Sequence, residues 1–282
     1  MDRVAKNETI QIDRLKLGPY ETNSYILTCP RTGDSVLVDA PAEASQILKA
    51  LKDTHPRYIL ITHSHTDHIG ALSELKSKLS VPIGVHHLDA KGLPVQADMI
   101  LEDGGKIDCG YMGLKILHTP GHTPGSLSFL IGRYLIAGDT IFPGGPGKTS
   151  SPANLKLIIE SISSKIFVLP DDTAIYPGHG DSTLLRKEKE EFSVFSSRPH
   201  DPNLFGDVLW LSSGPLSQGP TIISLPGGSL LLAHTPLPVL MIYVCPSAGL
   251  LIPAAGYAPP DSCDSAVRSA SHQRFRVYRN GN

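Results

Sequence analysis

The chain has 282 residues, 40% of them hydrophobic and 18% charged, and its formal net charge is −2. This composition allows one large or two small folded domains and excludes wholesale disorder. The near-neutral charge disfavours a general binder of nucleic acid or anionic lipid, and no apolar run approaches the roughly 20 residues that span a bilayer.

The first half of the chain predicts strands followed by alternation of strands and helices. Alternating apolar residues, or short β-branched runs bounded by turn residues, indicate the strands. These strands are expected at 10–15, 24–29, 35–38, 58–61 and 81–85. Apolar residues at helical spacing predict two helices, over 42–52 and over 69–79.

The second half continues the same pattern up to about residue 191. Strands are expected at 114–117, 127–131, 134–137 and 174–176, and helices at 154–164 and 184–191. Sheets with helices on their outer faces follow from this order, so the predicted class is a layered α/β fold.

The composition changes after residue 211. Nine prolines fall within 212–282, and charged side chains become sparse there. Proline interrupts every candidate helix in this stretch. We therefore predict a folded domain over 1–211 and an atypical, poorly ordered, proline-rich and charge-poor tail over 212–282.

A dense cluster of metal-binding residue types follows the predicted strand at 58–61. His63, His65, Asp67 and His68 lie within six consecutive positions in the order HxHxDH. Imidazole nitrogens and carboxylate oxygens are ligands that suit zinc, iron or manganese. Loops at strand ends hold such side chains on a rigid scaffold, so the segment predicts a metal site.

Three later strand ends carry similar groups. His122 lies in the loop after 114–117, Asp139 ends the strand at 134–137 within Gly-Asp-Thr, and His179 lies within Pro-Gly-His-Gly after 174–176. His86 and His87 match no such pattern, and we expect them at the surface or at a helix start.

Taken together, these motifs resemble the metallo-β-lactamase superfamily, and within it the glyoxalase II-like (hydroxyacylglutathione hydrolase-like) branch. The resemblance covers about residues 10–195 and leaves the C-terminal stretch outside it. It implies a four-layer αβ/βα sandwich with a dinuclear metal site at one edge of two packed sheets.

The resemblance also implies roles for individual residues. His63, His65 and His122 would bind the first ion, Asp67, His68 and His179 the second, and Asp139 both. Asp67 would in addition orient the attacking water or take its proton. Two more residues have alternatives that stay open: Asp39 either orients a ligand histidine from behind or is a turn residue, and Lys148 either contacts the substrate or is a solvated loop charge.

The implied activity is hydrolysis of a thioester such as S-lactoylglutathione by a hydroxide that two divalent ions generate, with zinc as the first choice and iron or manganese as alternatives. The rival interpretations are an iron-dependent persulfide dioxygenase, a lactonase, and a catalytically silent variant disrupted by its tail. A β-lactamase and a long-insert nuclease fit less well.

The expected partner is a small-molecule thioester, with neither nucleic acid nor membrane involved. The N-terminus has no apolar stretch before Ser24, so we expect a cytoplasmic protein, with an organelle stroma or matrix as the alternative. The sequence does not indicate an oligomeric state.

Overall fold

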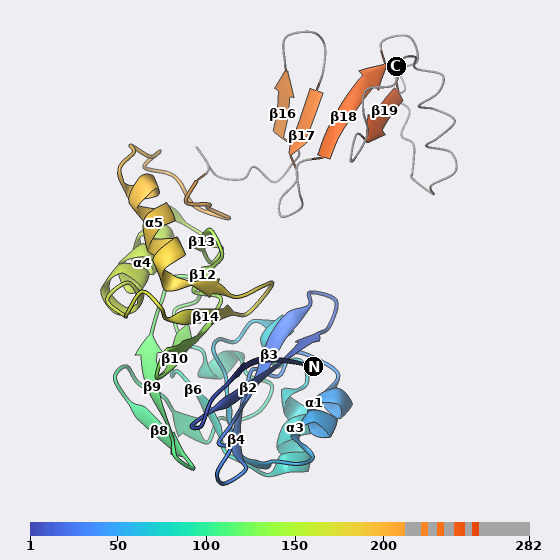
Figure 1. Ribbon diagram of the computed structural model, residues 1–282, viewed down its shortest axis with the longest axis vertical. Helices are drawn as coiled ribbons and strands as arrows, with labels where there is room; N and C mark the ends of the chain where they lie inside the picture. The colour runs from blue at the N-terminus through green and yellow to red at the C-terminus, as the bar shows by residue number, and fades with distance from the viewer. Residues whose placement is uncertain (212–220, 225–229, 234–239, 246–249, 254–282) are drawn as a thin grey trace. The chain divides into compact units, whose positions relative to one another are not determined.

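The computed structural model describes residues 1–211 together with the backbone of four later strands at 221–224, 230–233, 240–245 and 250–253. The chain divides into two compact units, Met1–Pro215 and Leu216–Asn282. The first unit contains two large sheets and their covering helices (Figure 1).

The first sheet has seven strands that follow one another in chain order. They are β1 (Asp2–Lys6), β2 (Gln11–Leu17), β3 (Thr22–Thr28), β4 (Asp34–Val38), β5 (His55–Leu60), β6 (Ile83–Val85) and β7 (Met99–Ile100). The strands from β1 to β4 pair antiparallel, and those from β4 to β7 pair parallel. Its helical segments are α1 (Ala44–Leu51), α2 (Thr66–Ile69), α3 (Leu72–Leu79) and η1 (Ala90–Gly92).

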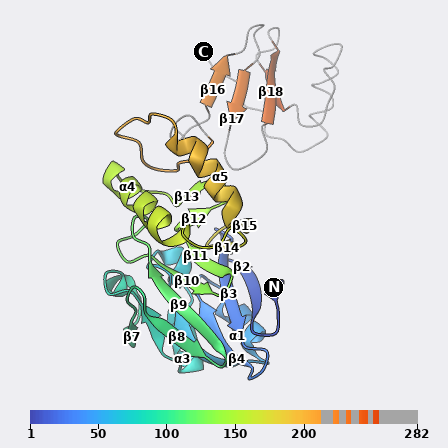
Figure 2. The same cartoon turned by 60° about the vertical axis from the view of Figure 1, so that its left-hand side comes forward.

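The second sheet has six strands in the order β15-β14-β11-β10-β9-β8. They are β8 (Lys106–Cys109), β9 (Met112–His118), β10 (Leu127–Ile131), β11 (Tyr134–Gly138), β14 (Ala174–Pro177) and β15 (Thr183–Leu184). A small hairpin, β12 (Ile141–Phe142) and β13 (Gly145–Pro146), follows β11. Helical segments α4 (Pro152–Ser161), η2 (Ile162–Ile166) and α5 (Leu185–Ser196) belong to this half (Figure 2).

Three hydrophobic clusters show how the layers stack. One lies between the sheets, a second between the first sheet and α1 with α3, and a third between the second sheet and α4 with α5. Strand β3 is buried along its whole length because it faces two clusters: Tyr25 and Leu27 point into the first and Ile26 into the second. The order helix, sheet, sheet, helix confirms the predicted αβ/βα sandwich.

All four predicted helices differ in their bounds from the structure, and two of the differences have a clear local cause. The helix expected over 69–79 is split into α2 and α3, because the Ala71 N–H donates to the carbonyl of Ala40 and the His68 carbonyl accepts from the Ala40 N–H, both at 2.8 Å. Helix α4 begins before residue 154, because the Ser151 hydroxyl accepts a hydrogen bond from the Asn154 N–H and Pro152 occupies the first turn.

The second unit contains a four-stranded antiparallel sheet in chain order. Its strands are β16 (Thr221–Ser224), β17 (Leu230–Ala233), β18 (Leu240–Cys245) and β19 (Leu250–Pro253). Most of the predicted tail at 212–282 lies outside the described residues, so its poor order stays a prediction. No helix in the described part of the chain is long and apolar enough to cross a membrane.

The end of the first unit packs firmly on α5. Trp210 is fully buried, and its ring meets Phe192 and Phe195 edge-on with centroids 5.1 and 5.2 Å away. Its backbone N–H donates to the carbonyl of Gly144 at 2.8 Å. Residues up to 210 therefore contribute to the core of this unit.

Replacing Trp210 by alanine should lower the free energy of unfolding of the full chain by about 3–5 kcal/mol, because a large buried ring leaves a cavity. Urea unfolding followed by circular dichroism measures the loss. The neighbouring side chain of Leu211 is 57% exposed, and Leu211→Ala should change stability by less than about 0.5 kcal/mol. Equal losses in the two variants would show that Trp210 is not part of the core.

Candidate metal centre

The candidate centre lies at an edge where strand ends of the two sheets meet. Parallel pairs β4–β5 and β11–β14 bring their carboxyl ends together, which is where open α/β sheets place their ligands. Asp39 follows β4, His63 to His68 follow β5, His122 follows β9, Asp139 follows β11 and His179 follows β14. The N–H of Leu127 in the second sheet donates to the carbonyl of Thr62 in the first at 2.8 Å, which joins the sheets here.

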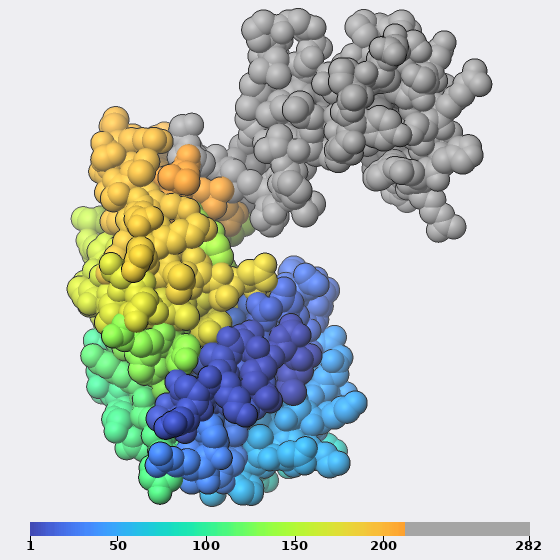
Figure 3. Space-filling view, viewed as in Figure 1, coloured from blue at the N-terminus to red at the C-terminus, as the bar shows by residue number. Residues whose placement is uncertain are grey.

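The loop that carries His179 is also tied to the first sheet. The carbonyl of Gly178 accepts a hydrogen bond from the Asn23 N–H at 2.7 Å, and the Asn23 side chain donates to the carbonyls of Pro177 and Gly180. In the space-filling view, the yellow segment before α5 meets the blue β2–β3 hairpin at the surface (Figure 3). One ligand loop of the second sheet thus has a fixed place against the first.

His63, His65 and His122 form the first triad of the centre. Their nearest ring nitrogens lie within 4.8 Å of one another. The Nδ1 atom of His65 is 3.1 Å from Nε2 of His63 and 2.9 Å from Nε2 of His122. Ligands of a tetrahedral zinc ion with bonds of about 2.0–2.1 Å stand about 3.3 Å apart, so the triad has the size of a zinc site.

Asp67, His68 and His179 form the second triad. The Nε2 atoms of the two histidines are 3.3 Å apart. The Oδ2 atom of Asp67 lies 3.2 Å from Nε2 of His179 and 3.7 Å from Nε2 of His68. The hydroxyl of Thr22 donates to the same carboxylate oxygen at 3.4 Å.

Asp139 lies between the two triads and contacts both. Its Oδ2 atom is 3.5 Å from Nε2 of His122 and 3.6 Å from Nε2 of His179, and its Oδ1 atom is 3.4 Å from Nε2 of His68. Oδ1 is buried and has no hydrogen-bond partner. A Cβ atom at residue 178 would lie 2.1 Å from this oxygen, so the close approach requires Gly178.

Hydrogen bonds at Nδ1, the ring nitrogen that faces away from the centre, fix the tautomers of three histidines. Nδ1 of His122 lies 2.8 Å from the carbonyl of Lys148, Nδ1 of His179 lies 3.1 Å from that of Tyr20, and Nδ1 of His68 lies 2.8 Å from the carboxylate of Asp39. Carbonyls and carboxylates only accept, so each Nδ1 carries the proton. In a neutral ring, Nε2 then presents a lone pair to the centre.

The imidazole lone pairs that face the centre are too close together to be stable without a cation between them. His65 contacts two Nε2 atoms through its single Nδ1, which carries at most one proton and can donate to only one of them at full strength. The unpartnered carboxylate oxygen of Asp139 adds negative charge beside them. Five imidazoles and two carboxylates are a donor set that divalent transition ions accept, so the residues fit two such ions.

The electrostatics of the centre separate its histidines into two kinds. Burial, reinforced by the neighbouring His68, lowers the pKa of His63 well below its usual value, and burial beside His122 lowers that of His65. Burial opposes protonation of His68 too, but the carboxylates of Asp39 and Asp139 outweigh it and raise the pKa of His68 to about 10. Burial would raise the pKa of Asp139, yet the imidazoles around it hold that pKa far below its usual range.

Asp39 lies directly behind the centre rather than in a simple surface turn. It is buried, and its φ of 60° is a left-handed conformation that is uncommon outside glycine. One carboxylate oxygen accepts from the Thr62 N–H at 2.8 Å, and the other accepts from the Thr62 hydroxyl and from Nδ1 of His68. The side chain therefore orients one predicted ligand and the start of the loop that carries three others.

Lys148 contacts the centre through its backbone only. Its carbonyl holds His122, while its side chain is more than half exposed and its Nζ lies 3.7 Å from the carboxylate of Asp207. The structure brings the seven predicted ligands and Asp39 together, whereas the Lys148 ammonium group faces the carboxylate of Asp207.

Of the two histidines predicted at the surface or at a helix start, His87 is exposed and His86 is not. His86 was expected at the surface, but its side chain is buried and stacks on His118 with ring centroids 3.9 Å apart. Its pKa is lowered to about 4, first by burial and then by the charge of His118. Asp89 was not predicted at all: it is a buried residue whose carboxylate contacts the loops of the first triad.

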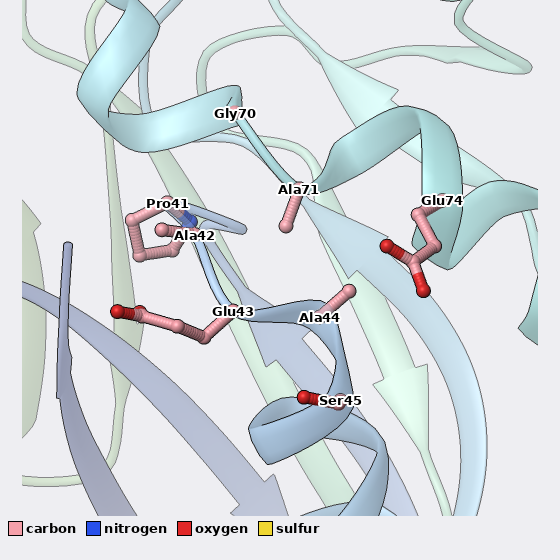
Figure 4. Close-up of a pocket in the computed structure, with 8 residues that line it drawn as sticks. All are labelled: Pro41, Ala42, Glu43, Ala44, Ser45, Gly70, Ala71 and Glu74. Carbon is pink, nitrogen blue, oxygen red and sulfur yellow. The ribbon is translucent and has the colours of Figure 1, made fainter.

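A separate surface hollow of about 440 Å³ lies between the starts of α1 and α3 (Figure 4). It is lined by Pro41, Gly70 and Ala71 and by the carboxylates of Glu43 and Glu74, and it includes none of the predicted ligands. A smaller hollow of about 190 Å³ borders the centre itself, with Tyr20, Thr22 and Asp67 in its wall.

Comparisons with known proteins agree with this geometry. A sequence model of the family described as the metallo-beta-lactamase superfamily matches residues 17–193. The probable metallo-hydrolase YqgX of Bacillus subtilis is 33% identical over 201 residues, which cover 63% of this chain and 94% of that protein. The hydroxyacylglutathione hydrolase GloC of Haemophilus influenzae is 32% identical over 188 residues, covering 58% of this chain and 89% of that protein. The crystal structure of TTHA1623 in a di-iron-bound form matches with a TM-score of 0.55 and 28% identity, over 63% of this chain and 96% of that one.

Proposed function

Because this chain belongs to the metallo-beta-lactamase superfamily, we propose that it is a hydrolase that cleaves thioesters such as S-lactoylglutathione with two divalent ions. The observation that carries the proposal is the position of Asp139, whose two carboxylate oxygens face histidines of both triads. A carboxylate in that position suits a pair of ions rather than one. The similarity to a relative named hydroxyacylglutathione hydrolase supports the thioester class.

Two ions in this centre would polarise the substrate carbonyl and bring the pKa of a water toward neutrality. The chain's own residues then have separate tasks. The histidines, Asp67 and Asp139 hold the ions, and Asp39 and Thr62 hold the histidines. The Oδ2 atom of Asp67 faces His179 and accepts from the Thr22 hydroxyl, so its other carboxylate oxygen, Oδ1, orients the attacking water and accepts its proton.

Two features favour a thioester with a small acyl group. A thiol with a pKa of about 8.5 leaves as a thiolate without a strong general acid, so the centre needs no further proton donor. The hollow beside Asp67 has a volume of about 190 Å³ and is lined by Leu17, Pro19 and Ala42 besides Tyr20. A pocket of that size accommodates a lactoyl group better than a long chain.

The activity is tested directly by incubating the zinc-loaded full-length protein with S-lactoylglutathione and measuring the release of free thiol. We expect turnover that His65→Ala abolishes, because this substitution removes the ring that contacts both other members of the first triad. The proposal would be wrong if a folded protein with two ions cleaved no thioester but opened lactones. It would be equally wrong if only the iron-loaded protein reacted, consuming oxygen with glutathione persulfide.

We further propose that Lys148 contacts a carboxylate of the glutathione carrier. Its backbone carbonyl contacts His122, and its exposed ammonium group lies 3.7 Å from the carboxylate of Asp207. An exposed ion pair contributes about 0.2–1 kcal/mol, so Lys148→Ala should raise the KM for S-lactoylglutathione by about 1.4- to fivefold and leave kcat unchanged. The KM for a lactoyl thioester of an uncharged thiol should not change, and an equal rise for both substrates would exclude this contact.

A further inference from the structure

One buried carboxylate, Asp89, connects the two loops that carry the first triad. It follows β6 and is 3% exposed. Its Oδ2 atom accepts hydrogen bonds from the Ser64 N–H at 2.8 Å and from the Thr123 hydroxyl at 3.0 Å. Its Oδ1 atom accepts one from the Gly125 N–H at 2.8 Å.

The residues that Asp89 contacts are interleaved with the predicted ligands. Ser64 lies between His63 and His65, and Thr123 directly follows His122. All three members of the first triad are thus next in sequence to a residue that this carboxylate holds. No member of the second triad adjoins a residue that donates to Asp89 in this way.

The two loops come from different sheets, so their separation is not set by strand pairing alone. The first follows β5 in the seven-stranded sheet, and the second follows β9 in the six-stranded sheet. Asp89 belongs to neither loop and lies between them. The contact of 2.9 Å between His65 and His122 depends on how closely the loops approach.

A carboxylate is the group that this position requires. Burial of a charge costs free energy unless donors surround it, and Asp89 receives three hydrogen bonds over its two oxygens. Its approach also depends on the residue it meets, because a Cβ atom at residue 125 would lie 2.4 Å from Oδ1. Gly125 therefore leaves the space that the carboxylate occupies.

We propose that Asp89 is a positioning residue that holds the loops of His63, His65 and His122 at the separation needed to bind the first ion. This inference rests on the metal centre proposed above and not on the thioester substrate. It assigns the residue to one of the two ion sites, which makes it testable by metal affinity alone.

The test compares Asp89→Asn in two backgrounds, each of which retains one ion site. His179→Ala leaves the first triad, and His122→Ala leaves the second. Zinc affinity is measured by competition with a chromophoric chelator. In the His179→Ala background, Asp89→Asn should weaken binding by about 10–100-fold, the usual effect of losing a partner behind a ligand. In the His122→Ala background, the affinity should stay the same.

Two further variants separate positioning from general loss of stability. Asp13 is also a buried carboxylate, held by Arg3 and Gln11 away from the centre, and Asp13→Asn should leave both affinities unchanged. Thr123→Val removes one of the three hydrogen bonds with little change in shape and should weaken only the first site, by less than Asp89→Asn does.

Thermal unfolding of each metal-free variant is recorded together with the affinities and shows whether the variant folds. If Asp89→Asn does not fold, the affinities of Thr123→Val test the inference instead. Equal losses at both sites, or no loss at the first, would overturn the inference. If the wild-type chain bound no ion, the metal centre and this inference would both be wrong. If it bound two ions but hydrolysed no thioester, only the proposed substrate would be wrong.

Discussion

Replacing Asp139 by asparagine should lower kcat/KM for the thioester by more than about 10³-fold. Removal of one oxyanion-hole donor already costs about 10²–10³-fold, and the loss of Asp139 would affect both ions at once. The substitution hardly alters shape but removes a negative charge that lies within 3.4–3.6 Å of three histidines. We expect the purified variant to retain at most one tightly bound ion. Steady-state kinetics and elemental analysis on the same preparation measure both effects.

The same variant carries a signature that does not depend on turnover. In the metal-free protein, the Asp139 carboxylate is one of the two groups that raise the pKa of His68 to about 10. Asp139→Asn should therefore lower the pKa of His68, which NMR titration of the metal-free protein detects. Asp108 is an exposed carboxylate paired with Lys106, and Asp108→Asn should change neither quantity. Wild-type metal content in Asp139→Asn would show that this carboxylate does not join the two sites.

The second large effect is expected at Asp67. If this side chain accepts the proton of the attacking water, Asp67→Ala should reduce kcat by about 10²–10⁴-fold, the usual contribution of a general base. Its Oδ2 atom is the oxygen that faces His179 and accepts from Thr22, so truncation also weakens the second triad. Kinetics at saturating zinc separate the loss of the proton acceptor from the weaker binding of the second ion. Excess zinc fills the second site again but does not replace the missing carboxylate. A variant that retained nearly wild-type kcat would exclude this role.

The fold class was predictable from sequence, and so was the convergence of the candidate ligands at one edge, for the same physical reason. Each candidate ligand directly follows an apolar strand, and strand ends of an α/β fold converge at one edge. His63 and His179 lie 116 residues apart in sequence, yet both follow strands whose apolar runs are plain in the sequence. The layered arrangement of helices was predictable too, because α1, α4 and the buried strands show clear periodicity.

Other features were not predictable because their cause lies in tertiary contacts. Strand β1 is largely exposed at the edge of its sheet and shows no strong apolar pattern. The break between α2 and α3 arises from backbone hydrogen bonds of His68 and Ala71 to Ala40, which is distant from them in the chain. Asp89 carries no sequence signal, since a single aspartate after a short strand is usually a turn residue, and only its burial between two loops reveals its role.

The proposed hydrolysis depends most directly on the number of ions that the wild-type chain binds. Full-length protein, loaded with zinc and freed of excess by gel filtration, should contain two ions per chain by elemental analysis, one for each triad with Asp139 between them. A folded protein that retained none, or a single ion even at saturating zinc, would contradict the dinuclear centre on which the proposed hydrolysis depends.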